Sequence, residues 1–279
     1  MTIIDAQVHI WPPETPARPY ITEDASKPHR VMPLGYEDLL REMAVAGVDR
    51  VILVPPSWEG CRNDYALEAA EKYPDRFAVM GKVPLNDPAS KAKLATWLAQ
   101  PGMLGFRISF RHSGTHSFLD DGTADWFWSD CERYDIPVMI FAPFAVARIG
   151  EIAERHPGLR VIVDHMGLNV QWKGKDLGPG VDLLLKFARL PNVAVKAFCL
   201  PCYAPNPIHF RRSIRRFTAS SKPSVRSGFF GAPIFHSCPA LTARQLRCLL
   251  KSSIFFRPKT KSGSWAKLSL NGCAGRCRN

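Results

Sequence analysis

Two histidines and one arginine stand in or at the ends of short apolar runs, where their side chains could transfer protons and bind anions. His9 and His165 each close such a run, and Arg107 lies within a third. Imidazole exchanges protons near neutral pH, and the planar guanidinium group pairs with carboxylates. Together they are typical of a site that binds an acidic small molecule and moves protons. A histidine in this position is also commonly a structural hydrogen-bonding residue, so these residues alone leave both interpretations open.

Three further side chains are candidates for the wall of such a site. Gln7 lies two residues before His9, and the alternation of side chains along a strand places both on one face. Trp11 and Trp58 follow the ends of two apolar runs, where large rings could line a pocket. The predicted catalytic residues are His9 and His165, and the predicted substrate-binding residues are Gln7, Arg107, Trp11 and Trp58.

The elements that must position these residues alternate between short β-branched runs and segments with helical spacing. Such runs are typical of parallel strands that are covered by helices. The expected strands are Ile3–His9, Asp49–Val54, Arg76–Gly81, Leu104–Phe110, Pro137–Phe141, Arg160–His165 and Val193–Lys196. The expected helices are Tyr36–Gly47, Asn63–Tyr73, Ala89–Ala99, Thr123–Tyr134, Ala145–His156 and Val181–Arg189.

This alternation fits either a doubly wound sheet or a (β/α)8 barrel. A repeat of roughly 28 residues favours an α/β barrel in which strands one to seven are present and the eighth unit is missing or garbled. In such a barrel the chemistry lies at the C-terminal ends of the strands. Lys196, at the end of the seventh strand, then either meets a carboxylate or pairs within the barrel.

Charge divides the chain at about residue 206. Residues 1–206 carry 22 Lys and Arg and all 25 Asp and Glu, whereas residues 207–279 carry 15 Lys and Arg and no acid. A net charge of +15 on one segment ordinarily indicates nucleic acid or an anionic membrane as a partner. We instead predict a barrel domain over residues 1–206 and a basic, poorly ordered tail over residues 207–279, because the tail is consistent with a shifted coding frame.

Composition limits the class of protein further. Hydrophobic residues make up 46% of the chain, which excludes wholesale disorder, and no apolar run reaches the length of about 18 residues that a spanning helix needs. The start Met1–Asp5 lacks the basic and apolar segments of a signal peptide. We expect a cytoplasmic protein whose partner is a small acidic molecule, with neither nucleic acid nor membrane as a partner.

Three segments resemble motifs of one enzyme family. Ile4–Trp11 is similar to the opening-strand pattern I-D-x-H-x-H, Gly105–Arg107 to G-x-R on strand four, and Val161–Gly167 to V-x-D-H-x-G on strand six. In this order and spacing, over residues 1–206, they resemble the amidohydrolase-related family of predicted metal-dependent hydrolases with TIM-barrel folds. Its members include lactonases for sugar lactones and pyrone dicarboxylates, and decarboxylases and hydratases of aromatic-derived acids.

The chain departs from the family pattern where a metal would be bound. Gln7 stands in place of the family's first histidine, no histidine ends Val138–Ala142, and no aspartate follows Asp182. A divalent metal needs three or more donors, and the resemblance leaves only His9 and His165 as weak candidates. We therefore expect no cofactor and no tightly bound catalytic metal, although the resemblance implies a divalent ion such as zinc in intact relatives.

The coding frame offers an explanation for the basic tail. When Phe230–Pro239 is back-translated and its codons are regrouped one base earlier, the triplets can spell W-G-T-D-F-S-L-L-P, which resembles the family's strand-eight motif. The same shift lets Pro207–Ile214 spell Y-P-F-P-S-L-H and Leu270–Gly275 spell E-W-L-R-W, both typical of the family. We hypothesise that a single-base insertion or deletion near Asn206 scrambled residues 207–279.

The resemblance implies a hydrolase that opens a lactone or similar cyclic ester of a carboxylated small molecule. His9 and His165 would polarise or orient the carbonyl, and Arg107 would bind a carboxylate or the developing oxyanion. The family's strand-eight aspartate would be the base, so we expect impaired activity in this chain. The alternatives are a metal-dependent decarboxylase or hydratase of an aromatic-derived acid, and a non-enzymatic basic binding protein.

Overall fold

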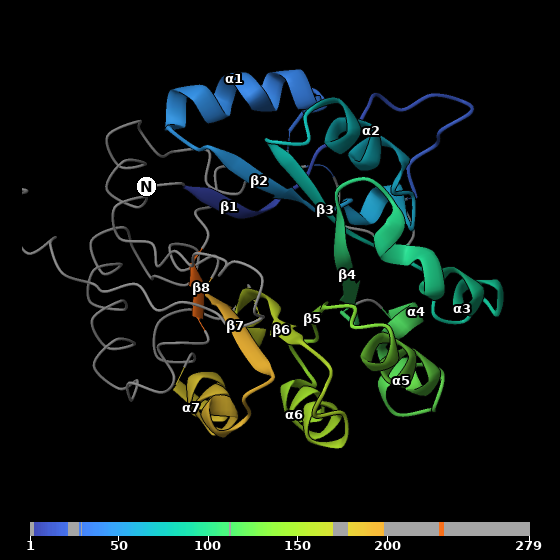
Figure 1. Ribbon diagram of the computed structural model, residues 1–279, viewed down its shortest axis with the longest axis vertical. Helices are drawn as coiled ribbons and strands as arrows, with labels where there is room; N and C mark the ends of the chain where they lie inside the picture. The colour runs from blue at the N-terminus through green and yellow to red at the C-terminus, as the bar shows by residue number, and fades with distance from the viewer. Residues whose placement is uncertain are drawn as a thin grey trace, which may run out of the picture.

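The computed structural model describes residues 3–21, 28, 30–111, 113–169, 178–197 and 229–231, which form a curled parallel sheet with helices outside it (Figure 1). The spatial order of the eight strands follows the chain, and each neighbouring pair is parallel. The strands are β1 (Ile4–Val8), β2 (Arg50–Leu53), β3 (Phe77–Gly81), β4 (Met103–Ser109), β5 (Val138–Phe141), β6 (Val161–Val163), β7 (Val193–Ala197) and β8 (Phe229–Gly231).

Helices connect successive strands and lie on the convex side of the sheet. The α-helices are α1 (Tyr36–Ala46), α2 (Asp64–Lys72), α3 (Ala89–Lys93), α4 (Ser113–His116), α5 (Asp125–Arg133), α6 (Val146–Arg155) and α7 (Gly178–Lys186). Short 3-10 helices are η1 (Ser57–Glu59), η2 (Leu94–Ala99), η3 (Ser117–Leu119), η4 (Asp164–Gly167) and η6 (Phe187–Arg189). Within these described segments, no helix is long and apolar enough to cross a membrane.

The predicted TIM-barrel-like alternation is confirmed, and the third helical segment shows a local difference. Residues Ala89–Ala99 form α3 followed by the tighter η2 instead of one α-helix. This winding places the indole of Trp97 on β4, where it donates a hydrogen bond to the carbonyl of Gly105 over 3.2 Å. The same indole stacks on Phe106 with ring centroids 4.1 Å apart. Packing on the sheet therefore accompanies the change in helix type.

Two glycines meet local demands of this fold. Gly47 ends α1 with φ of +72°, a left-handed conformation that glycine adopts without steric strain. Gly105 lies where β4 passes close to the chain before β5, and a Cβ there would be 2.3 Å from the carbonyl oxygen of Pro137. A side chain at residue 105 would therefore push β4 and β5 apart.

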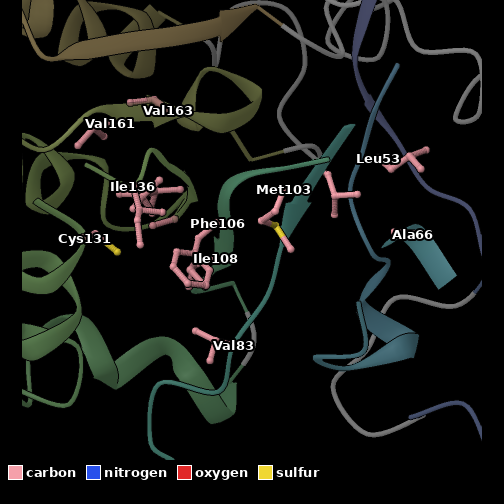
Figure 2. Close-up of a cluster of buried hydrophobic side chains, with 14 of the residues drawn as sticks. Leu53, Ala66, Val83, Met103, Phe106, Ile108, Cys131, Ile136, Val161 and Val163 are labelled. Atoms are coloured by element: carbon pink, nitrogen blue, oxygen red, sulfur yellow. The ribbon is translucent and has the colours of Figure 1, made fainter. Parts of the chain in front are cut away.

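The hydrophobic core lies between the sheet and its helices. It includes Leu53, Phe106, Ile136 and Val161, which come from four units of the barrel (Figure 2). Burial of each such side chain contributes about 1.5–3 kcal/mol, so this layer holds the strands in order. The strand ends, and with them the candidate site, are fixed by this packing.

A short described segment of the predicted tail lies next to β7. Phe229–Gly231 pairs with β7 in parallel, Lys196 lying opposite Phe230. The ends of the strand order are therefore β1 and β8. Most of the predicted tail, residues 207–228 and 232–279, lies outside the described residues.

Candidate active site

The ends of β1 and β2 hold His9 in a defined orientation. His9 follows β1 directly, and its Nδ1 donates a hydrogen bond to the backbone carbonyl of Val54 over 2.7 Å. Because a carbonyl oxygen only accepts, the proton stands on Nδ1, and a neutral ring then has its lone pair on Nε2. His9 can therefore act through Nε2 as a base or as a hydrogen-bond acceptor.

Asp164 lies at the centre of a buried ionic cluster. Its side chain is fully enclosed, and its Oδ2 accepts hydrogen bonds from Nε and Nη2 of Arg107, both over 3.1 Å. The ammonium group of Lys196 pairs with Oδ1. Burial alone would raise the pKa of Asp164, but its neighbours His165, Lys196 and Arg107 outweigh burial and hold that pKa well below its usual range. Asp164 is therefore an ionised carboxylate that joins β4 to β7.

Lys196 extends this cluster across the barrel to β1. Its Nζ contacts Oε1 of Gln7 and lies 3.2 Å from Sδ of Met139, and its side chain is only 1% exposed. One contact meets both roles that we left open for Lys196, because it pairs within the barrel with the carboxylate of Asp164. Lys196 was not among the predicted site residues, although its place at the end of the seventh strand was the available signal.

His165 is held by a sharp turn instead of a strand. We predicted that strand six reaches His165, but β6 ends at Val163 and Asp164–Gly167 forms η4. His165 has φ of +50°, a left-handed conformation that is unfavourable for residues other than glycine. The turn sets the imidazole edge-on to Phe141, with ring centroids 4.9 Å apart, and its Nε2 3.4 Å from Oδ2 of Asp164.

The surroundings of His165 keep its imidazole neutral. Burial lowers the pKa of His165 to about 3, and the positive charges of Lys196 and Arg107 act in the same direction. The carboxylate of Asp164 opposes them without reversing the shift. At neutral pH His165 is therefore a hydrogen-bonding group, and it could accept a proton only if a ligand or partner changed its surroundings.

Asp5 is the second buried carboxyl group of the interior. Burial raises its pKa to about 8, against the hydrogen bond that Oδ1 accepts from the backbone N–H of Gln7 over 3.1 Å and the charge of Lys196. Asp5 is thus largely protonated at pH 7. Arg107 and Lys196 then face one ionised acid, Asp164, and this described interior carries an excess of positive charge.

Two more cations follow the ends of β3 and β4. Burial, with the charge of Arg107 adding to it, lowers the pKa of Lys82 to about 7, and the same two causes lower that of Arg111. Asn63 fixes the backbone of Lys82, accepting from its N–H over 2.8 Å and donating to its carbonyl over 2.9 Å. Our sequence reasoning missed Lys82 and Arg111, although both follow expected strands. Cations that oppose one another's charge favour an anionic ligand.

Trp11 and Trp58 pack against each other beside His9. The centroids of the two indoles are 5.1 Å apart in an edge-to-face arrangement, and the ring of Trp58 lies 6.3 Å from that of His9. Both tryptophans are buried in the hydrophobic core. The structure brings the three predicted rings together, and contact between the tryptophans and a substrate stays a prediction.

The residues of this interior do not fit a divalent metal. In the part of the chain that the structure describes, no three His, Cys, Asp or Glu side chains come together as a set that could hold one. The oxygens of Asp164 already face Arg107 and Lys196, and the amide oxygen of Gln7 faces Lys196 as well. A metal ion among them would have to displace or repel two cations.

The loops above β1 and β2 are joined by Arg18. Its Nε donates to Oε2 of the buried Glu59 over 2.8 Å, and its Nη1 donates to Oδ2 of Asp64 at the start of α2 over 2.6 Å. The backbone N–H of Ile21 donates to the carbonyl of Trp58 over 2.8 Å. The first loop is therefore fixed over the end of β2, next to the rings beside His9.

The fold and the position of these groups define a parallel barrel with polar residues at the C-terminal ends of its strands. The family model described as amidohydrolase matches residues 4–223 of the chain. The chain therefore belongs to the amidohydrolase family, as the motif resemblance predicts.

Curated relatives include two enzymes named for lactones and one decarboxylase. The 4-sulfomuconolactone hydrolase of Hydrogenophaga intermedia is 28% identical over 163 residues, 58% of this chain and 52% of that protein. The L-fucono-1,5-lactonase of Burkholderia ambifaria is 25% identical over 174 residues, 58% and 56% of the two chains. The gamma-resorcylate decarboxylase of Rhodococcus jostii is 27% identical, over 38% of this chain and 44% of that protein. The chain thus spans about half the length of the curated relatives it matches.

Solved structures share the fold at low identity. A probable 2-pyrone-4,6-dicarboxylic acid hydrolase from Acinetobacter baumannii, with citric acid bound, has a TM-score of 0.71 and 18% identity over 90% of this chain and 92% of that chain. An amidohydrolase from Burkholderia multivorans with bound zinc has a TM-score of 0.69 and 18% identity, covering 90% and 91% of the two chains. At these identities the likeness establishes the barrel fold.

Proposed function

We propose that this chain is the barrel of a hydrolase that opens a lactone or similar cyclic ester of a carboxylated small molecule. The observation that carries the proposal is a group of cationic side chains at one end of the barrel: the buried Arg107 and the partly buried Lys82 and Arg111 lie near histidines that are neutral or oriented by hydrogen bonds. Such an arrangement suits a substrate that brings its own carboxylates. The lactones in the names of two curated relatives agree with it.

Each proposed residue has a task that its contacts allow. Arg107 uses Nε and Nη2 on Asp164, so Nη1 can serve a substrate carboxylate or the oxyanion that forms when the lactone carbonyl is attacked. His9, protonated on Nδ1, accepts a hydrogen bond or a proton at Nε2. His165 in its neutral form orients the carbonyl.

The base that should activate water is missing from the sequence after Asp182. We propose that residues 207–279 are read out of frame from a point near Asn206, so that residues 1–206 are the barrel domain and this chain is impaired. The position of β8 supports this: Phe229–Gly231 pairs with β7, and the regrouped triplets for Trp-Gly-Thr-Asp begin at Phe230. The motif would then stand at the end of an eighth strand, where a base belongs.

Two experiments test the proposal. Resequencing the gene around codon 206 should reveal one inserted or missing base, and a gene that encodes residues 207–279 as they stand would contradict the frame hypothesis. The restored protein should then hydrolyse carboxylated lactones in a pH-indicator screen, with activity falling at least 10-fold in Arg107→Gln. A restored protein that is inactive on all lactones but cleaves carboxylated phenols would contradict the lactone assignment.

A decarboxylase is the second candidate. It is favoured by the curated gamma-resorcylate decarboxylase and by a manganese-bound 5-carboxyvanillate decarboxylase from Novosphingobium aromaticivorans with a TM-score of 0.50. The donor set around Asp164 argues against a metal-dependent reaction of this kind, because Arg107 and Lys196 already neutralise the carboxylate. Release of carbon dioxide from a carboxylated phenol by the restored protein would support the decarboxylase.

A further inference from the structure

Lys196 is enclosed in the middle of the barrel, among the oxygen atoms that could otherwise bind a metal. Its Nζ contacts Oδ1 of Asp164 from the β6 end and Oε1 of Gln7 from β1, with Sδ of Met139 on β5 at 3.2 Å. The ammonium group thus lies where β1 approaches the neighbouring strands β5 and β6 inside the curled sheet, although β1 is far from both in the sheet order. A lysine is rarely buried this deeply without a structural or chemical reason.

The charges around Lys196 show what an additional cation would meet. Asp164 is the ionised acid of the cluster, and Arg107 already donates two hydrogen bonds to it. With Lys196 in place, two cations share one carboxylate. A divalent ion would add two further positive charges at close range, where the shielding by water is weak. The negative charge of Asp164 is therefore already balanced by protein cations. The chain differs here from the zinc-bound amidohydrolase structure.

We propose that Lys196 is a positioning residue that supplies a protein-borne cation in place of a divalent metal at this point of the barrel. It neutralises Asp164 and holds Gln7 by the carbonyl oxygen, so the amide hydrogens on Nε2 are the groups that Gln7 can offer as donors. Gln7, which replaces a histidine of the family pattern, and Lys196 act as one unit: a neutral amide accepts from the ammonium where an imidazole would bind a metal. This occupancy by the Lys196 ammonium does not depend on which reaction the barrel catalyses.

The test compares Mn2+ binding to the full chain and its variants after removal of metals with a chelator. Mn2+ prefers oxygen and nitrogen donors, so the eight cysteines of the chain interfere less than they would with zinc. Electron paramagnetic resonance of free Mn2+ measures its binding. Lys196→Ala opens space beside Asp164 and should bind Mn2+ at least 10-fold more tightly than the unaltered chain, and Asp164→Asn added to Lys196→Ala should abolish the gain. Lys196→Arg keeps the charge and should gain nothing.

Matched controls separate this role from a purely structural one. Lys91 is exposed and pairs with Asp130 over 3.7 Å, so Lys91→Ala should leave Mn2+ binding unchanged. A folded Lys196→Ala protein that gains no Mn2+ binding would overturn the proposal, as would a gain in Lys196→Arg. If Lys196→Ala does not fold, Mn2+ binding to the unaltered chain tests the proposal. Tight Mn2+ binding that Asp164→Asn abolishes would overturn the proposal, and the absence of tight Mn2+ binding would support it.

Discussion

Two ionic clusters of this barrel use the same kinds of groups in opposite proportions. In the interior, Arg107 and Lys196 face the single carboxylate of Asp164, and the side chains of Asp164 and Lys196 are 0% and 1% exposed. At the rim, Arg18 faces two carboxylates, Glu59 and Asp64, and the Asp64 side chain is 65% exposed.

The interior cluster is part of the candidate active site, whereas the rim cluster holds one loop against the next. The inner cluster has surplus positive charge, joins β1, β4, β6 and β7, and lies beside the predicted catalytic residues. The rim cluster binds one loop to the next through a bidentate guanidinium and ends in solvent. Removing one partner of a buried ion pair leaves the other charge without a partner and without water. In an exposed pair, water can solvate the charge that remains. Changes in the interior cluster should therefore have the larger effect on the free energy of unfolding and on the binding of anions. Changes in the rim cluster should mainly affect the order of the nearby loop.

The largest effect is expected from Lys196→Met. Removing the ammonium group leaves Oδ1 of Asp164 buried without its cation, which should lower the free energy of unfolding by about 3–5 kcal/mol. Urea denaturation followed by circular dichroism measures this loss. Adding Asp164→Asn to Lys196→Met should not recover the loss, because the buried Arg107 then loses its carboxylate partner. A loss no greater than that of Lys91→Met, at an exposed site, would contradict the comparison.

Asp5 should give the interior an unusual dependence on pH. Its folded pKa, about 8, lies above the ordinary value of 3.8, so its contribution to stability is complete below pH 3.8, falls as the pH rises from there, and is lost as the pH passes 8. By linkage the loss approaches about 1.4 kcal/mol per pH unit in this window, or roughly 2 kcal/mol between pH 6 and pH 8 after allowance for relaxation. Asp5→Asn should flatten the profile in thermal melts from pH 5 to pH 9. Parallel profiles for the two proteins would show that Asp5 ionises normally.

Lys82 should link anion binding to proton uptake. Its pKa of about 7 leaves it mostly neutral at pH 8, and a bound carboxylate would raise that pKa, so citrate should bind with uptake of a fraction of a proton. Calorimetry in two amine buffers of different ionisation enthalpy measures the uptake. Lys82→Gln should abolish it and weaken citrate about 10-fold, or about 1.4 kcal/mol. Equal uptake by the two proteins would assign the proton to another group.

Strand alternation was enough to name several residues of the candidate site. Gln7 and His9 were predicted to share a face because residues two apart in a strand do so. Arg107 was expected near the end of strand six because parallel strands end at one edge, and its ion pair with Asp164 agrees with that rule. The helix Tyr36–Gly47 and its end could also be predicted, because the left-handed residue that ends a helix is commonly glycine.

Other features depend on packing between distant segments and leave no local pattern. The contact between Gln7 and Lys196 joins residues 189 positions apart and depends on the curl of the whole sheet. The left-handed turn at His165 replaces a predicted strand end, and a histidine and a methionine give no local sign of it. Lys82 looked like any polar residue after a strand, and only its burial beside Arg107 makes it distinctive.

The smallest effect on global stability is expected at the rim. Arg18→Met leaves Glu59 without its guanidinium, but the loop that carries Arg18 can move away and admit water to the carboxylate, so the free energy of unfolding should fall by only about 1 kcal/mol. The local consequence should be larger: the amide of Ile21, which donates to the carbonyl of Trp58, should exchange its hydrogen at least 10-fold faster. Hydrogen exchange with mass spectrometry compares this peptide with a core peptide from β5, which should not change. If Arg18→Met destabilises the whole chain as much as Lys196→Met, the rim is part of the core and the distinction between the two clusters fails.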